Sequence, residues 1–228
     1  MCAQPTHHCR LYVIPAREAP VALILRRGPT KWYHIMRWHM DSDAFEHGAW
    51  FRGRIYENRC DISPDGKLMI YMCSRGTPRP GYGFEWTALS RAPWLYALTL
   101  WPWMDTMGGG GRFLSNDHLA LHAGCPIDTH PDHPLQGIDV TYGGEDYHPD
   151  FGAASWSGHD HLGNVIFCRE GKLFRHVDGK DHEIVDLNGL RPNPQPAPDW
   201  AKQPLIDAQD GIGGPEARED PGAPENLQ

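Results

Sequence analysis

A tight turn at Ser63-Pro64-Asp65-Gly66, with β-prone residues on both sides, constrains the fold of this chain more than any other feature. Pro64 fixes its own φ at a value that suits the turn, and Gly66 readily takes the positive φ that closes it. The flanking segments, residues 54–62 and 68–73, therefore form a hairpin. Side chains alternate between the two faces of a strand, so we expect both faces of the second arm to carry apolar residues.

The rest of the first 190 residues repeats this pattern of short β-prone runs between turns. The chain has 25 glycines and 21 prolines, together 46 of 228 residues, which disfavours a bundle of long helices. The run 21–25 is apolar throughout, which predicts a strand buried on both faces. In all we expect eleven to thirteen short strands and an all-β domain over residues 10–190. The other β-prone runs are 10–15, 31–40, 84–89, 95–101, 113–122, 164–168, 172–176 and 181–187.

Residues 60–71 resemble the inner hairpin of WD40-like propeller blades of the bacterial type, in which a turn such as Ser63-Pro64-Asp65-Gly66-Lys67 joins two strands. Residues 170–175 are similar in a weaker form. The resemblance implies a small or irregular β-propeller, and about 45 residues per blade leave room for four or five blades. A β-sandwich or a barrel stays open as the alternative, and the resemblance implies no activity.

Three segments do not fit the strand pattern. Gly108 to Gly111 predicts a mobile connection, and residues 123–151 form a long loop of the kind that is functional or poorly ordered. Residues 1–9 are expected to be a flexible N-terminus. Residues 191–228 form a Pro-rich tail with three basic and seven acidic residues, expected to be largely disordered from Asp207 onward, with residues 198–201 attaching its start to the body.

Charge and apolar content narrow the range of partners. The chain has 21 basic and 29 acidic residues, a net charge of −8, and no basic run, so we expect no nucleic acid. The most apolar window, residues 92–104, is too short to span a bilayer, so we expect no membrane partner. The start lacks a secretory pattern and the cysteines lack a CxxC pair, which favours reduced thiols in the cytoplasm. Oligomeric state stays open.

Motifs for nucleotide binding and for serine hydrolases are missing from the sequence. Gly108 to Gly111 lacks the Lys-Ser/Thr of a P-loop, and no Gly-x-Ser-x-Gly elbow occurs. Ser157, His159 and Asp160 are neighbours in the sequence, whereas triad residues converge from separate segments. The leading hypothesis is therefore a non-enzymatic binding or scaffold module with a protein partner and no cofactor.

Tryptophan and arginine mark the expected partner-binding face. The two-residue spacing of Trp50, Arg52 and Arg54 would put all three on one side of a strand, and Trp and Arg dominate interface hot spots. Further candidates lie in a tryptophan-rich stretch, where the large rings alternatively form the core or hold a small molecule stacked on Trp86 or Trp101. The predicted partner-binding residues are Trp50, Arg52, Arg54, Trp86, Arg91, Trp101 and Trp103.

Histidine supports the alternative hypothesis, a metal-dependent hydrolase or lyase. Nine of the 14 histidines lie between residues 118 and 182. The spacings His118/His122 and His159/His161 each put two imidazoles on one face, and Asp117 and Asp160 adjoin these pairs. Zinc or another first-row divalent ion would suit such a site and would acidify a bound water. The metal ligands would be His118, His122, His159, His161 and Asp160; ordinary polar histidines are the alternative.

Overall fold

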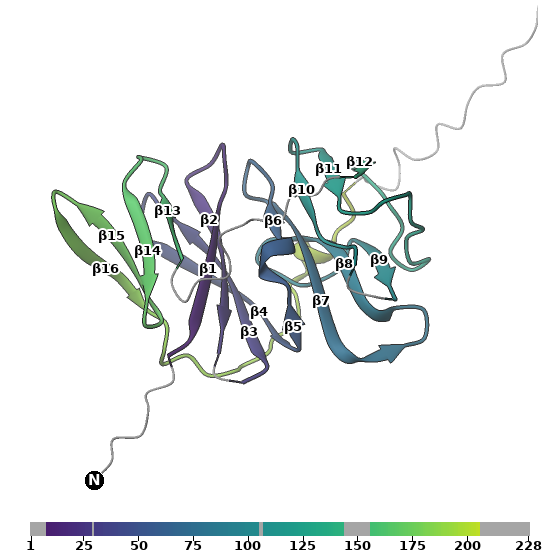
Figure 1. The fold of residues 1–228 in the computed structure, drawn as a ribbon, viewed down its shortest axis with the longest axis horizontal. Coiled ribbons are helices and arrows are strands. Elements are labelled where there is room, and N and C mark those ends of the chain that lie inside the picture. The colour runs from purple at the N-terminus through teal and green to yellow at the C-terminus, as the bar shows by residue number, and fades with distance from the viewer. Residues whose placement is uncertain (1–7, 29, 105–106, 144–155, 206–228) are drawn as a thin grey trace, which may run out of the picture.

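The computed structural model describes residues 8–28, 30–104, 107–143 and 156–205, which form four small sheets in a row (Figure 1). The first sheet contains β1 (Arg10–Pro15), β2 (Val21–Arg27), β3 (Trp32–His39) and β4 (Ala44–Arg52). The second contains β5 (Arg54–Ile55), β6 (Asp61–Ile62), β7 (Leu68–Arg79), β8 (Gly83–Arg91) and β9 (Thr99–Trp103). The third contains β10 (Gly111–Phe113), β11 (His118–Leu121) and β12 (Asp139–Tyr142). The fourth contains β13 (Ser157–His159), β14 (Val165–Arg169), β15 (Lys172–Val177) and β16 (Lys180–Asp186).

Each sheet is small and blade-like, and the prediction of an all-β, propeller-like domain is confirmed. Neighbouring strands run antiparallel, except that β11 and β12 are parallel. The helical elements of the described residues are one 3-10 turn, η1 (Glu57–Arg59), and one short helix, α1 (Asp199–Lys202). Neither helical element is long and apolar enough to cross a membrane.

The predicted hairpin joins β6 to β7. Ile62 pairs with Met69, and Gly66 has a φ of 74°. The hydroxyl of Ser63 accepts hydrogen bonds from the backbone N–H groups of Lys67 and Leu68, so the side chain caps the turn that Pro64 and Gly66 shape. The weaker copy at residues 170–175 is also a hairpin, from β14 to β15, with Glu170 and Gly171 at positive φ.

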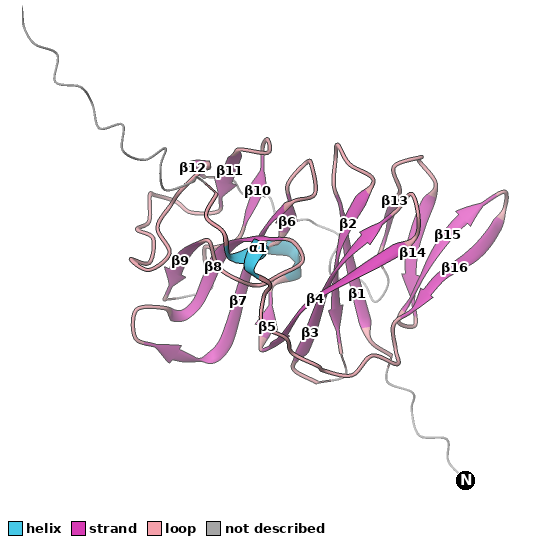
Figure 2. Ribbon diagram, turned by 180° about the vertical axis from the view of Figure 1, so that it is seen from behind, coloured by secondary structure: helices cyan, strands magenta, loops and turns pink. Residues whose placement is uncertain are grey.

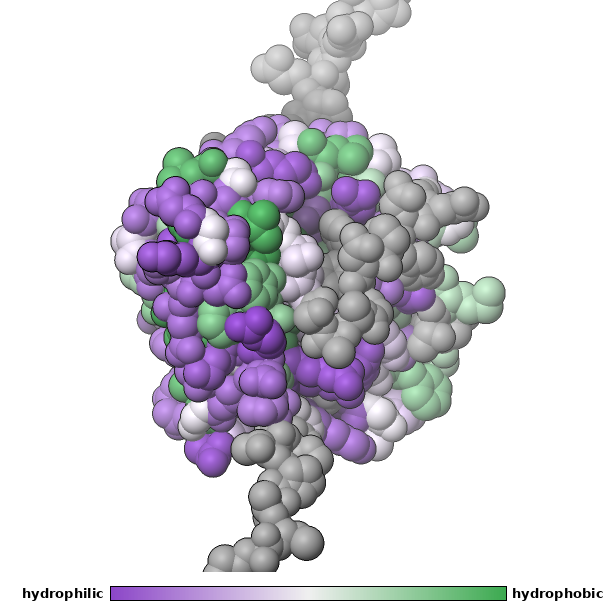
Figure 3. Space-filling model, turned by 60° about the vertical axis from the view of Figure 1, so that its left-hand side comes forward, coloured by the Kyte–Doolittle hydropathy of each residue, from purple (hydrophilic) through white to green (hydrophobic). Residues whose placement is uncertain are grey.

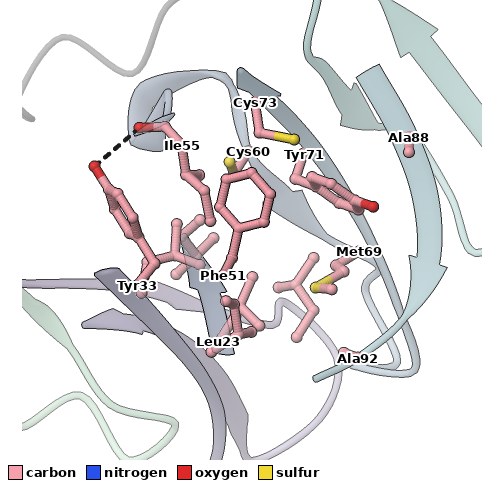
Figure 4. Packing of buried hydrophobic residues seen from close by; sticks show 14 of the residues in the cluster. Leu23, Tyr33, Phe51, Ile55, Cys60, Met69, Tyr71, Cys73, Ala88 and Ala92 are labelled. Atoms are coloured by element: carbon pink, nitrogen blue, oxygen red, sulfur yellow. Dashed lines mark hydrogen bonds between the residues drawn. The ribbon is translucent and has the colours of Figure 1, made fainter. Parts of the chain in front are cut away.

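The sheets pack face to face through apolar clusters. Figure 4 shows the cluster between the first and second sheets, with Leu23 and Phe51 on one side and Met69, Tyr71 and Cys73 on the other. On the opposite face of β7, Leu68 and Ile70 join the cluster with the third sheet. The central strands β2 and β7 are thus buried on both faces, as their apolar runs predicted.

The order of the sheets in space differs from their order in the chain. The fourth sheet packs on the free face of the first sheet, through Ile166 and Leu173 against Ile24 and Trp38. In space the order is therefore fourth, first, second, third. Among the described residues no buried apolar cluster joins the third sheet to the fourth, so this row is not closed into a ring by such a cluster. Figure 3 views the side on which the fourth sheet lies, where hydrophilic residues surround small hydrophobic patches.

The chain after β16 returns along the stack as a strap, residues 188–205 (Figure 2). Its first part is held by buried Arg26, whose guanidinium donates to the carbonyl oxygens of Leu187 (2.7 Å) and Leu190 (3.2 Å). Its last part contains α1, in which Ala201 is fully buried. The predicted flexible and disordered ends fall largely on residues 1–7 and 206–228, which lie outside the described residues.

One loop prediction needs correction, and a second loop is described in part. Gly109 and Gly110 are buried, and a β-carbon on Gly110 would overlap the backbone of Arg59, so this glycine run packs tightly where a mobile connection was predicted. The described part of the long loop, residues 123–143, contains β12. It is hydrogen-bonded to β9, because the backbone N–H of Leu100 donates to the carbonyl oxygen of His133 and the N–H of His130 donates to the carbonyl oxygen of Leu100. Residues 144–151 of that loop lie outside the described residues.

Candidate functional site

Two adjoining hollows lie where the first and second sheets meet, on the edge that is lowest in Figure 1. We call this edge the lower rim; it carries residues 28, 30–31, 52–54 and 74–77. Lys31, Gly53 and Arg75 line both hollows, so the two form one groove. We call it the cationic groove and define it by Arg27, Lys31, Arg52, Arg54 and Arg75, with the rings of Trp32, Trp50 and Tyr56.

Gly53 explains how the groove forms. Its N–H donates to the carbonyl oxygen of Lys31 (2.8 Å), and a β-carbon at this position would overlap the carbonyl oxygen of Ser74. The chain crosses here from β4 to β5, so Arg52 ends the first sheet and Arg54 begins the second. The prediction that both share one strand face is wrong, because the glycine crossing separates them. Both arginines nevertheless line the groove, from opposite sides of the crossing.

The cations of the groove are largely unpaired. Within the described part of the chain, Arg27, Lys31 and Arg52 make no hydrogen bond or ion pair through their side chains. The guanidinium of Arg75 lies over the ring of Phe51, 5.5 Å from its centroid. Like charges gathered without counter-ions repel one another and destabilise the folded state. On a chain with a net charge of −8, such a cluster suits an anionic partner.

Arg54 is the exception, because it compensates a buried acid. Its guanidinium lies 3.4 Å from the carboxylate of Glu57, which also accepts a hydrogen bond from the hydroxyl of Tyr33 (2.7 Å). Burial, together with the neighbouring Glu57, raises the pKa of Tyr33. A second buried acid, Glu85, accepts from the hydroxyl of Tyr56. Burial and this bond raise the pKa of Tyr56 to about 12, so both phenols stay protonated and both acids are engaged inside the fold.

Stacked rings form the other wall of the groove. Trp50 stacks on His34 with ring centroids 4.1 Å apart, and Trp32 meets Trp50 edge-on at 6.4 Å. His34 is 2% exposed, and both its ring nitrogens lack a hydrogen-bond partner. Burial, with the charges of His47 and Arg26, lowers the pKa of His34 to about 3. The imidazole therefore stays neutral and acts as a flat support that fixes the indole of Trp50.

A third hollow adjoins the groove on the other side of Arg75; we call it the aromatic pocket. Its volume is 210 Å³, below the range of pockets for drug-sized ligands and suited to a single ring. Phe51 and Trp86 meet edge-to-face inside it, with centroids 6.2 Å apart. Burial raises the pKa values of Tyr71 and Cys73 in its wall, so these groups stay uncharged. The lining residues are Phe51, Tyr71, Cys73, Arg75, Tyr82, Trp86, Leu95, Tyr96, Ala97, Leu100 and His133.

The predicted partner-binding residues thus divide into two groups. Trp50, Arg52 and Arg54 lie in the cationic groove, and Trp86 lies in the adjoining aromatic pocket. The others lie elsewhere in the fold, in positions described next.

Arg91 donates to the strap carbonyls of Gln203 (3.3 Å) and Pro204 (3.1 Å) and so attaches the strap. Trp101 is fully buried between the second and third sheets, and so cannot stack on a ligand in this state. Trp103 is 9% exposed and donates to the hydroxyl of Thr87 (3.0 Å). These three residues therefore hold the fold together.

The sequence analysis missed Arg27, Lys31 and Arg75. A usable signal existed for Arg75: it follows Tyr71 and Cys73 at two-residue intervals along β7, so it extends the face that packs on the first sheet. For Arg27 and Lys31 the signal was weaker, because each flanks an ordinary turn between β2 and β3. Their role becomes visible only once the second sheet is placed beside that turn.

The predicted four-histidine metal site is not formed. His118 and His122 belong to the third sheet and the residue after it, whereas His159 and His161 lie at the β13–β14 turn of the fourth sheet. The first and second sheets stand between these two ends (Figure 1). Across residues 8–28, 30–104, 107–143 and 156–205, no group of three or more His, Cys, Asp or Glu side chains could hold a metal ion.

Asp160 has a structural role in place of the predicted ligand role. Its carboxylate accepts hydrogen bonds from the N–H groups of Leu162 (3.0 Å) and Asn164 (2.9 Å) and lies 2.9 Å from the guanidinium of Arg175. Partial burial works against ionisation, but these hydrogen bonds and the Arg175 charge outweigh it and lower the pKa of Asp160. The carboxylate thus fixes the turn from β13 to β14.

Comparison with known proteins gives one structural likeness. No family model matches the chain, and no curated protein matches it. Among solved structures it is similar to the β-propeller domain of the Trilobed protease from Pyrococcus furiosus, which has an open velcro topology. The identity is 14%, and the match covers 79% of this chain with a TM-score of 0.33. The chain spans 58% of the length of that structure.

Proposed function

We propose that this protein is a non-enzymatic binding module that presents the cationic groove to a protein partner. The observation that carries the proposal is the gathering of Arg27, Lys31, Arg52 and Arg75 beside the rings of the groove, with no ion-pair partner among the described residues, on an acidic chain. Arginine next to tryptophan is the composition of interface hot spots. Repulsion among these cations does not stabilise the folded state, so we infer that they serve to bind a partner.

Two other sequence-based features agree with this role. The thiols of the five described cysteines are free, which supports a reducing compartment such as the cytoplasm. A relationship to WD40-like propellers, indicated by the Ser63–Lys67 turn, would fit a binding function, although a fold of this type hosts enzymes as well. The metal-dependent hydrolase loses its support, because its histidines lie at opposite ends of the sheet row.

The test is to identify a partner and to measure its affinity for matched variants. Proteins retained from a lysate of the source organism by the full chain are identified by mass spectrometry, and the principal one is purified. Isothermal titration then gives its Kd for wild type and for Lys31→Ala/Arg52→Ala. We expect at least about a tenfold weaker Kd for this variant, because two charge-assisted contacts are removed.

The control variant is Lys67→Ala/Lys180→Ala, which removes the same charge from exposed positions away from the groove. It should bind the partner as wild type does. Equal affinity of all three proteins would show that the groove is not the binding surface. Retention of no protein at all by the wild type would also contradict the proposal.

A further inference from the structure

Building on the proposed function, we propose that the partner docks through an extended acidic segment carrying one aromatic side chain, with its carboxylates on the cationic groove and its ring in the aromatic pocket. The geometric basis is Arg75, which lines the groove and the pocket at once. A single extended segment passing Arg75 therefore reaches both. Successive residues of such a segment are about 3.3 Å apart and point to alternate sides, so an anchor ring can point inward between carboxylates.

The cations of the groove favour carboxylates on an extended chain. Three of the four unpaired groups are guanidinium groups, which bind a carboxylate through two parallel hydrogen bonds. Of the two acids beneath, Glu57 is bound by Tyr33 and paired with Arg54, and Glu85 is bound by Tyr56, and neither forms an ion pair with the other four groove cations within the described residues. A nucleic acid needs a wider basic surface than one groove on an acidic body offers. A short acidic peptide needs only the groove.

The pocket favours an aromatic anchor. Its wall contains the rings of Phe51, Tyr82, Trp86 and Tyr96, and aromatic pairs gain from the edge-to-face contacts that Phe51 and Trp86 already show. Its 210 Å³ would accept one ring but not a larger ligand. Tyr96 is 38% exposed at this pocket, so it can be truncated without opening the core.

The experiment measures binding of fluorescein-labelled peptides to the full chain by anisotropy. The probe is the peptide EDEFEDE; EDEAEDE lacks the ring, KKKFKKK reverses the charge, and a single-stranded DNA oligomer supplies a different polyanion. We expect EDEFEDE to bind about tenfold or more tightly than EDEAEDE, because burial of a phenyl ring is lost. Raising NaCl from about 50 to about 300 mM should weaken both acidic peptides.

Two single substitutions separate the two halves of the site. Tyr96→Ala should weaken EDEFEDE and leave EDEAEDE unchanged, because it alters only the pocket. Arg52→Ala should weaken both acidic peptides by the same factor, because it alters only the groove. Comparing each variant with wild type on both acidic peptides gives a thermodynamic cycle, which shows whether the peptide ring and the groove charge contribute independently to the free energy of binding. The Lys67→Ala/Lys180→Ala protein should bind both peptides as wild type does.

The proposal is overturned if KKKFKKK or the DNA binds as tightly as EDEFEDE, or if the ring in the peptide makes no difference. Those results leave the proposed function standing when the purified partner still needs Lys31 and Arg52. If the partner is also indifferent to Lys31→Ala/Arg52→Ala, both proposals fail together.

Discussion

The two rims of the sheet row use charge in opposite ways. On the upper rim in Figure 1, which carries residues 16–20, 63–67, 114–117 and 160–164, the cations Arg17 and Lys67 each have a carboxylate partner. Arg17 lies 3.7 Å from buried Asp61, and Arg175 lies 2.9 Å from Asp160, whereas the pair of Lys67 with Asp65 is exposed and contributes little to stability. On the lower rim, Lys31 and Arg52 have no such partner among the residues that the structure describes. The comparison separates charges that hold the fold from charges that are free to act on another molecule.

The upper rim shows what paired charge does for this fold. Buried Asp61 accepts a hydrogen bond from the N–H of Phe113 (2.8 Å) and lies 3.7 Å from Arg17, whose guanidinium also donates to the Phe113 carbonyl oxygen. Asn116 accepts from the N–H of Asp65 (2.8 Å). These contacts tie the turns of the first three sheets together. Because the apolar interfaces of the described residues do not form a closed ring, these polar contacts between sheets add to the stability of the stack.

The largest effect we predict is at the upper rim. Asp160→Ala leaves the N–H groups of Leu162 and Asn164 without their acceptor and Arg175 without one of its two carboxylate partners. We expect a loss of about 3 kcal/mol in the free energy of unfolding at pH 7, measured with urea.

The same site gives a pH test. The pKa of Asp160 is lowered in the folded state, so its stabilisation is present above the ordinary pKa near 4 and is lost as pH falls through the folded value. The difference between wild type and Asp160→Ala should therefore shrink below about pH 4. A constant difference would assign the effect to packing rather than to the carboxylate.

The next effect concerns His34, which supports the groove ring of Trp50 at the lower rim. Its folded pKa of about 3 lies below the ordinary value near 6.5, so the unfolded chain binds the proton first as pH falls. Wild type should therefore lose about 2 kcal/mol of stability between pH 7 and pH 5 through this residue. In His34→Phe this part of the pH dependence should disappear in urea titrations. His182→Phe, at an exposed position, should keep it.

A smaller loss is expected for Arg54→Ala, the lower-rim cation that does have a partner. Glu57 would remain buried with only Tyr33 bound to it, at a cost of about 1–2 kcal/mol, less than for a fully buried pair because Arg54 is partly exposed. Thermal unfolding measures this change. Adding Glu57→Gln to Arg54→Ala should recover much of the loss, because a neutral amide needs no counter-ion. A second loss of equal size would refute the ion pair as the cause.

The sequence predicted the features of the fold that depend on residues close together along the chain. The Ser63–Gly66 turn and the double burial of residues 22–25 follow from local backbone preferences and short apolar runs, and both are found. Trp50, Arg52 and Arg54 were assigned to one surface, and they do line one groove, but by way of a sheet crossing at Gly53 that no local rule revealed. Arg75 joins them only because the second sheet packs on the first.

The histidine prediction failed for a related physical reason. The spacing of His118/His122 and of His159/His161 correctly describes each pair, but a joint site needs the third and fourth sheets to meet. The fourth sheet packs instead on the first, because Ile166 and Leu173 match the apolar face of Ile24 and Trp38. Long-range packing decides which sheet the fourth sheet contacts, and the spacing of histidines along the chain gives no information about such packing.

The central claim is that Lys31 and Arg52 serve binding and not folding, and charge reversal tests it most directly. The measurement is the urea unfolding free energy of Lys31→Glu/Arg52→Glu against wild type at low salt. Because the reversal replaces repulsion within the groove by attraction to Arg27 and Arg75, we predict equal or slightly higher stability, by up to about 0.5 kcal/mol. A loss of about 2 kcal/mol or more, comparable to that of Asp160→Ala, would contradict the account, since it would show that these cations hold the fold together.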